Sequence, residues 1–199
     1  MTLKEFLKSK TFICIVVLLV IALVCGGLLA IMNDLLAVTE EEKMQRAIKK
    51  IYGGNVDYEE IAVAEEYKTN EFGSVDGVYA FKDGNYLIKT TGGKGFQGGT
   101  VTLWIVAEYK DGAFEGFKSV AVDSYEKQTL MSSFDDNFTG VYSSDRSDRG
   151  VKEGKNFGLQ NSDNEIGNIV SGATRTSNAF NNAVNAALYY IRNVLEGGK

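Results

Sequence analysis

The sequence contains no histidine and no proline, and only two of its 199 residues are cysteines. Without histidine, catalytic triads with an imidazole base, His-ligated metals and imidazole proton shuttles are excluded. Without proline, there is no cis-proline turn and no polyproline docking segment. Cys14 and Cys25 both lie in the first apolar stretch, so the rest of the chain holds no disulfide, iron–sulfur cluster or c-type haem. We predict no catalytic residue and no metal site, and any redox chemistry requires an organic cofactor.

One long hydrophobic run is present near the N-terminus. Residues 11–32 carry no charge, and this length is sufficient to cross a bilayer as a helix. A cleavable signal peptide is the alternative, but its apolar core is normally roughly 7 to 15 residues long, which favours a retained anchor here. A lipoprotein anchor at Cys25 is disfavoured because Val24 stands where a small residue is expected.

The charges flanking this run predict its orientation. Three lysines precede it, whereas acidic residues follow it, so the positive-inside rule places the N-terminus in the cytoplasm and the body of the protein outside the cytoplasmic membrane. Residues 33–199 contain 18 Lys and Arg and 25 Asp and Glu, a net charge of −7. An acidic domain of this kind disfavours nucleic acid as a partner.

Helical patterns bracket the part of the chain that follows the anchor. Thr39 and Glu42 fit a capping box, after which apolar residues recur at helical spacing until Gly53. A second apolar stripe precedes Gly197 and predicts a C-terminal helix; it consists of Phe180, Val184, Ala187, Leu188, Ile191 and Leu195. We divide the chain into an N-terminus and anchor (1–32), a linker with a helical lead-in (33–74) and a folded domain (75–199).

Two hairpin signals lie between these helices. One turns at Asp83 and Gly84, and the other turns at Asp111 and Gly112. They predict four antiparallel strands, and residues 123–165 are predicted to form a short helix followed by loops. The expected fold class is α+β, with a single N-terminal transmembrane helix followed by an antiparallel sheet with packed helices.

Residues 93–98 match the glycine pattern of a dinucleotide-binding loop, but their context does not. That fingerprint follows a strand and opens a helix, whereas these residues lead into the strand pattern TVTLWIV. A glycine-rich strand entry, closely approached by another segment or a ligand, explains them better.

The segment directly before the C-terminal helix is rich in small and hydroxyl residues. Residues 168–177 read NIVSGATRTS, and the N–H groups of a helix that starts here would favour a phosphate. An ordinary N-cap loop has the same composition, so the residues alone leave both interpretations open.

Within this segment, a tetrad followed by Thr176 and a helix resembles the flavinylation motif of the FMN-binding domain family. The tetrad consists of Ser171, Gly172, Ala173 and Thr174. The family includes the G subunit of Rnf-type ion-translocating oxidoreductases and the C subunit of the Na+-translocating NADH:quinone reductase. Its members share an N-terminal anchor, an exterior domain, a Gly-rich stretch before a strand pair and a helix after the motif, so the resemblance covers nearly the whole chain.

The resemblance implies FMN as cofactor, joined through a phosphoester to Thr174 by a separate flavin transferase, with the other tetrad residues forming the turn beneath the phosphate. Arg175 is expected to offset phosphate charge, and Thr176 is the rival acceptor. Asn168 stands where the family usually has Asp. The family's Glu-Thr-Pro-Gly-Leu-Gly segment corresponds to residues 126–131, where Glu126 and Leu130 match. The resemblance implies that this segment and the strand entry at residues 92–99 approach the motif loop, with Glu126 and Leu130 as the expected pocket residues. The alternative for Leu130 is a core residue of a short helix.

The resemblance therefore implies a membrane-anchored extracytoplasmic electron carrier, a subunit of an Rnf-type complex rather than an enzyme acting alone. Its implied partners are the flavin transferase, the other subunits of a membrane redox complex and the membrane itself. Two alternatives remain: a non-redox extracytoplasmic binding module, and a flavinylated carrier outside Rnf that serves extracellular electron acceptors.

Overall fold

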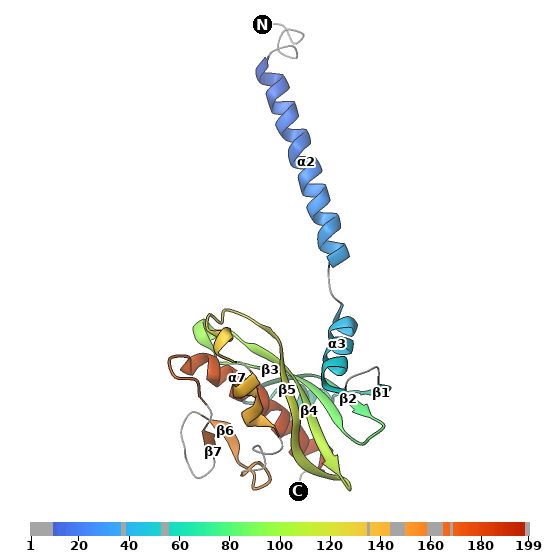
Figure 1. Ribbon diagram of the computed structural model, residues 1–199, viewed down its shortest axis with the longest axis vertical. Helices are drawn as coiled ribbons and strands as arrows, with labels where there is room; N and C mark the ends of the chain where they lie inside the picture. Colours follow the sequence, from blue (N-terminus) through green and yellow to red (C-terminus); the bar gives the residue numbers. More distant parts are fainter. Residues whose placement is uncertain are drawn as a thin grey trace. The chain divides into compact units, whose positions relative to one another are not determined.

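The computed structural model describes residues 10–36, 39–52, 56–134, 136–143, 150–158, 165–167 and 169–197. The chain divides into two compact units, Met1–Met44 and Gln45–Lys199. Asn168 lies outside the described residues, as do residues 144–149 and 159–164. Figure 1 shows the described elements.

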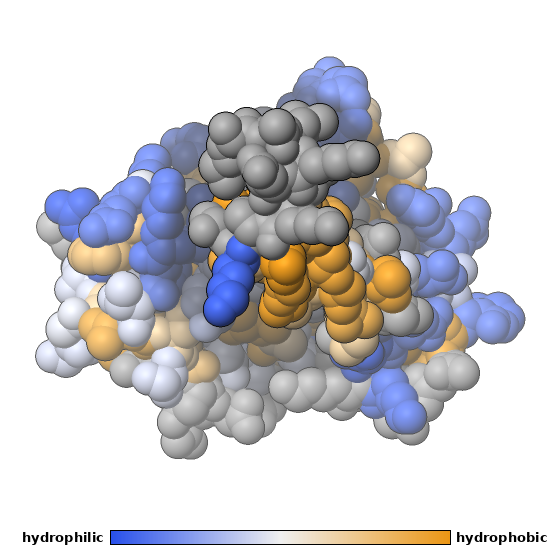
Figure 2. Space-filling view, turned by 90° about the horizontal axis from the view of Figure 1, so that it is seen from above, coloured by the Kyte–Doolittle hydropathy of each residue, from blue (hydrophilic) through white to orange (hydrophobic). Residues whose placement is uncertain are grey.

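The first unit contains the long helix α2, Lys10–Leu36. Its stretch Phe12–Met32 has a mean hydropathy of 3.2, and none of it is buried within the protein. Figure 2 shows the contrast between orange apolar side chains along α2 and blue hydrophilic side chains spread over the visible face of the larger unit. Such a surface on a helix of this length suits a bilayer rather than water, and a signal sequence would share the property.

Helix α3, Glu40–Tyr52, begins where the capping pattern predicts. The Glu42 backbone N–H donates to Thr39 Oγ1 at 3.2 Å, which satisfies one of the N–H groups that the first turn leaves free. Ile48, on the apolar face of this helix, is fully buried.

The larger unit contains a five-stranded antiparallel sheet in the order β1-β2-β3-β4-β5. Its strands are β1 Tyr58–Ile61, β2 Gly73–Phe81, β3 Tyr86–Gly92, β4 Val101–Lys110 and β5 Ala113–Tyr125. The β4–β5 turn has positive φ at both central residues, Asp111 (52°) and Gly112 (79°), as a two-residue hairpin turn of the primed type requires. The α+β class and both predicted hairpins are confirmed.

The antiparallel sheet of the described residues has one strand more than the four that were predicted. β1 is the additional edge strand, and its sequence YEEI contains two glutamates that give no alternation strong enough to signal a strand. The short helix α4, Glu65–Lys68, leads from it toward β2.

The prediction of a short helix and loops for residues 123–165 also needs correction. The described part of this region contains the short helical turns η2 Met131–Ser133, α5 Asp136–Thr139 and η3 Gly140–Tyr142. It also contains strand β6, Asn156–Gly158, which pairs in parallel with β7, Glu165–Gly167. Three-residue strands have no readable period, so only the tertiary pairing defines them.

Helix α7, Thr174–Tyr190, packs across β2, β3 and β4 on one face of the sheet and continues as a π-helical turn, η4 Ile191–Leu195 (Figure 1). Thr90 Oγ1 donates to the Ala183 carbonyl at 2.8 Å, so helix and sheet are also joined by a buried hydrogen bond. Phe180 on this helix stacks with Tyr142 at a centroid distance of 5.2 Å. This packing holds the first turn of α7 at the end of the sheet where β3 ends and β4 begins.

Asn185 connects α7 to β6. Its Oδ1 accepts from the Phe157 N–H at 2.7 Å, and its Nδ2 donates to the Phe157 carbonyl at 2.6 Å. Because Asn185→Ala leaves both buried backbone groups without their partner, we expect it to lower the free energy of unfolding by about 2–4 kcal/mol. Thermal denaturation of the purified chain measures this loss, and an unchanged midpoint would contradict it.

Candidate functional site

Three segments distant in sequence meet at one pocket of about 250 Å³. The first is the glycine-rich strand entry at residues 92–99, the second is the segment 126–131, and the third is the loop that leads into α7. They provide the lining residues Phe96, Thr129, Leu130, Gly172, Ala173, Thr174, Arg175 and Thr176. The structure thus brings together the three segments that the sequence analysis singled out separately.

The loop before α7 turns at Gly172, whose φ of +81° lies in the left-handed region that favours glycine. The Ala173 N–H donates to the Val170 carbonyl at 3.0 Å, which closes the turn. The Val170 N–H donates to Ser177 Oγ at 2.9 Å, and this hydroxyl donates to the Ala173 carbonyl at 3.1 Å. The hydroxyl of Ser177 is therefore used in holding the loop, whereas Ser171 is exposed and outside the pocket lining.

Helix α7 begins at the pocket without a side-chain cap. Ala173 occupies the N-cap position and has no side-chain oxygen with which to accept from the N–H groups of the first turn. The N–H groups of that turn and the positive end of the helix therefore favour an anion at the pocket.

The two candidate threonines differ in their surroundings. Thr174 is exposed and lines the pocket. Thr176 is only 3% exposed, and its Oγ1 donates to Gln128 Oε1 at 2.9 Å. Both threonines line the pocket, but Thr174 is exposed to a ligand, whereas Thr176 is buried and its hydroxyl is bonded to Gln128.

Gln128 links all three segments, and the sequence analysis did not name it as a site residue. Its Oε1 accepts from the Phe96 N–H at 3.1 Å as well as from Thr176, and its Nε2 donates to the Glu126 carbonyl at 2.8 Å. Phe96 and Thr129 were also missed. In the sequence, the only indication that Gln128, Phe96 and Thr129 belong to the site is their position within the two segments expected to approach the motif. Their residue types alone do not indicate a ligand.

Of the two residues predicted in the segment 126–131, only one lines the pocket. Leu130 lines the pocket and is 43% exposed, which makes it an apolar surface open to a ligand. The Glu126 side chain is exposed, 3.8 Å from Lys127 Nζ, and is absent from the pocket lining. Its backbone exchanges hydrogen bonds with Thr100, which extends the β4–β5 pairing to the pocket.

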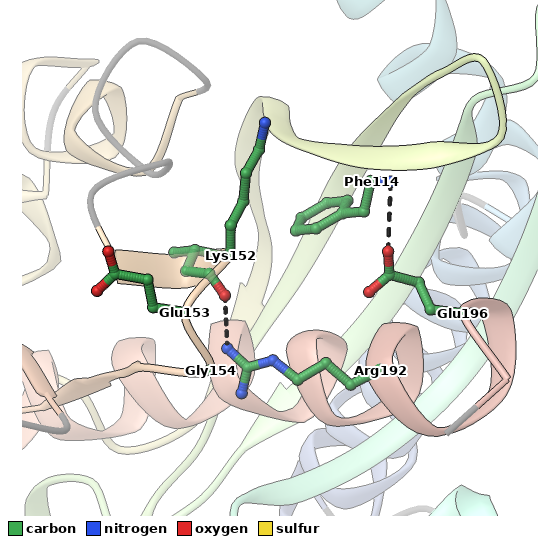
Figure 3. Close-up of a pocket in the computed structure, with 7 residues that line it drawn as sticks. Phe114, Lys152, Glu153, Gly154, Arg192 and Glu196 are labelled. Atoms are coloured by element: carbon green, nitrogen blue, oxygen red, sulfur yellow. Dashed lines mark hydrogen bonds between the residues drawn. The ribbon is translucent and has the colours of Figure 1, made fainter. Parts of the chain in front are cut away.

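A second, larger pocket of about 500 Å³ lies beside the C-terminal end of α7 (Figure 3). Arg192 points from η4 toward the loop 150–156 and donates to the carbonyls of Val151 and Lys155 at 3.2 and 2.7 Å. Burial lowers the pKa of Arg192, while nearby Glu196 acts in the opposite direction. These bonds to backbone carbonyls give Arg192 a structural role, which leaves the smaller pocket as the candidate site.

A comparison with protein families matches residues 60–189 to the FMN-binding domain. A search of curated proteins gives no significant match. The match covers most of the chain, including strands β2 to β5 and all three pocket segments, so the chain belongs to the FMN-binding domain family. FMN is accordingly its cofactor.

Proposed function

We propose that this protein is a membrane-anchored extracytoplasmic electron carrier whose FMN is joined through a phosphoester to the Thr174 hydroxyl. The observation that supports this most directly is the exposed Thr174 hydroxyl at the uncapped N-terminus of α7, inside a pocket of an FMN-binding domain. Flavin bound there would supply reversible uptake and release of electrons, and the protein would bind, orient and tune it.

The pocket residues fit the two chemically different ends of FMN. The first turn of α7 presents free N–H groups and Arg175 to the phosphate. Phe96 and Leu130 present partly exposed apolar surface, of the kind that contacts a flavin ring.

The partners follow from the same proposal. A separate flavin transferase would install the cofactor from a flavin dinucleotide: the Thr174 hydroxyl would attack the phosphate next to the flavin and lose its proton, the diphosphate bond would break, and a nucleoside monophosphate would leave. The carrier would act as a subunit of a membrane redox complex similar to the Rnf type. To test carrier function, the full chain is co-expressed with a flavin transferase and purified in detergent. A yellow protein whose flavin absorbance is bleached by dithionite and restored by air supports the proposal, and a colourless protein contradicts it.

The topology is tested separately. The uncharged stretch Phe12–Met32 of α2 and the three lysines before this stretch support an orientation with residues 33–199 outside the cytoplasmic membrane. Protease added to intact spheroplasts should therefore digest the domain while a cytoplasmic marker protein survives. A domain that is digested only after the cells are lysed would contradict the proposed orientation.

A further inference from the structure

We infer that Gln128 is the positioning residue of the flavin pocket, fixing one wall against the first turn of α7 and keeping the Thr176 hydroxyl from acting as a second acceptor. The inference rests on the proposed function for the identity of the ligand. Its structural basis is a side-chain amide, 7% exposed, that bonds to a group in each of the three pocket segments.

The hydrogen bonds of Gln128 join the strand entry to the first turn of α7, and a bond from Asn182 Nδ2 to the Gly93 carbonyl at 2.9 Å joins the same two elements further along the helix. Its bond to the Phe96 N–H holds the short turn η1, Phe96–Gly98, which carries the aromatic wall of the pocket. Its bond from Thr176 holds the helix that carries Thr174 two residues earlier. One amide oxygen therefore joins the apolar wall of the pocket directly to the helical turn that carries the attachment residue.

Two glycines provide the space that this amide occupies. A Cβ on Gly95 would lie 2.7 Å from Gln128 Nε2, and a Cβ on Gly99 would lie 2.6 Å from the same atom. The Gly95 N–H also donates to the Gly99 carbonyl at 3.0 Å, which closes the loop around the amide. The glycines at these two positions are thus explained by Gln128 as well as by a ligand.

The hydrogen bond from Thr176 to Gln128 also affects which of the two threonines is joined to the flavin phosphate. The Thr176 hydroxyl is 3% exposed and its proton is directed to Gln128 Oε1, so attack on a flavin phosphate would require breaking that bond and opening the helix start. Thr174 lies exposed two residues away, where neither step is needed.

The test uses the full chain co-expressed with a flavin transferase and measures the initial rate of covalent flavin attachment. Gln128→Met keeps the length of the side chain and removes its hydrogen bonds, and Thr176→Val removes the other partner. Each is expected to slow attachment on the order of tenfold, because the cost of one lost buried hydrogen bond corresponds to about that factor. The double variant should be no slower than Gln128→Met alone, since both changes remove the same bond.

Two controls separate positioning from general destabilisation. Thr176→Ser keeps the hydroxyl and should attach flavin within about twofold of the wild-type rate. Asn185→Ala removes a comparable amide, 11 residues beyond Thr174 and so about 16 Å along the helix, and should lower stability without slowing attachment. Equal slowing in Gln128→Met and Asn185→Ala at matched stability would overturn the inference.

Amide hydrogen exchange gives a readout that does not depend on flavin. In Gln128→Met, peptides covering residues 93–100 and 126–133 should exchange on the order of tenfold faster than in the wild type, and in Asn185→Ala they should not. A wild-type chain that takes up no flavin would count against the proposed function alone. Unchanged exchange at residues 93–100 in Gln128→Met would overturn the inference about Gln128 itself.

Discussion

Thr174→Ala should abolish covalent flavin while leaving the fold intact. The Thr174 hydroxyl is the one that the pocket presents to a ligand, and its removal leaves no atom at that position to carry the phosphoester. Because the side chain is exposed, the free energy of unfolding should change by less than about 0.5 kcal/mol. After co-expression with a flavin transferase, the wild-type band on a denaturing gel should fluoresce under ultraviolet light, and the variant band should be dark.

The control for this prediction is Thr176→Ala, which removes the hydroxyl of the neighbouring rival acceptor. Its band should still fluoresce, because attachment to Thr174 is slowed in this variant but not abolished. Fluorescence that survives in Thr174→Ala would place the attachment elsewhere. A wild-type band that is dark, and stays dark in Asn168→Asp, would contradict covalent attachment altogether.

Gly92→Ala should destabilise the domain far more than alanine at the adjacent glycine. A Cβ at this position would overlap the Ala179 carbonyl oxygen and the Ala183 nitrogen, both of which belong to the backbone of α7. Because neither atom can rotate away, the helix must shift from the sheet. We expect a loss of about 3 kcal/mol and a fall of roughly 10 °C in the unfolding midpoint.

The adjacent Gly93→Ala is the matched control, since a Cβ there would meet no atom within 4 Å. This variant should unfold within about 0.5 kcal/mol of the wild type. Circular dichroism during heating measures both variants. Equal unfolding midpoints for Gly92→Ala and Gly93→Ala would contradict the prediction that α7 lies too close to the end of β3 to leave space for a Cβ at residue 92.

The main elements of this fold could be predicted from the sequence because each one repeats a simple pattern. The uncharged run forms most of α2, and the two Asp-Gly pairs form the hairpin turns at Gly84 and Gly112. The stripe that begins at Phe180 became the buried face of α7. Strands β1 and β6 escaped prediction because four and three residues are too few to show a period.

The candidate site was predictable only where a motif fixes the register. The tetrad located Thr174, and the pocket geometry now distinguishes it from Thr176 by exposure and hydrogen bonding. Gln128 escaped prediction because its importance lies in contacts with residues 32 and 48 positions away. Such contacts depend on the packing of α7 against the sheet, which no local pattern encodes.

The most direct test of the account is tandem mass spectrometry of the chain co-expressed with a flavin transferase. We predict that the peptide containing residues 171–177 gains the mass of one FMN less one water, and that fragmentation places this mass on Thr174. That peptide found unmodified, or the flavin mass found on any other residue, would contradict it.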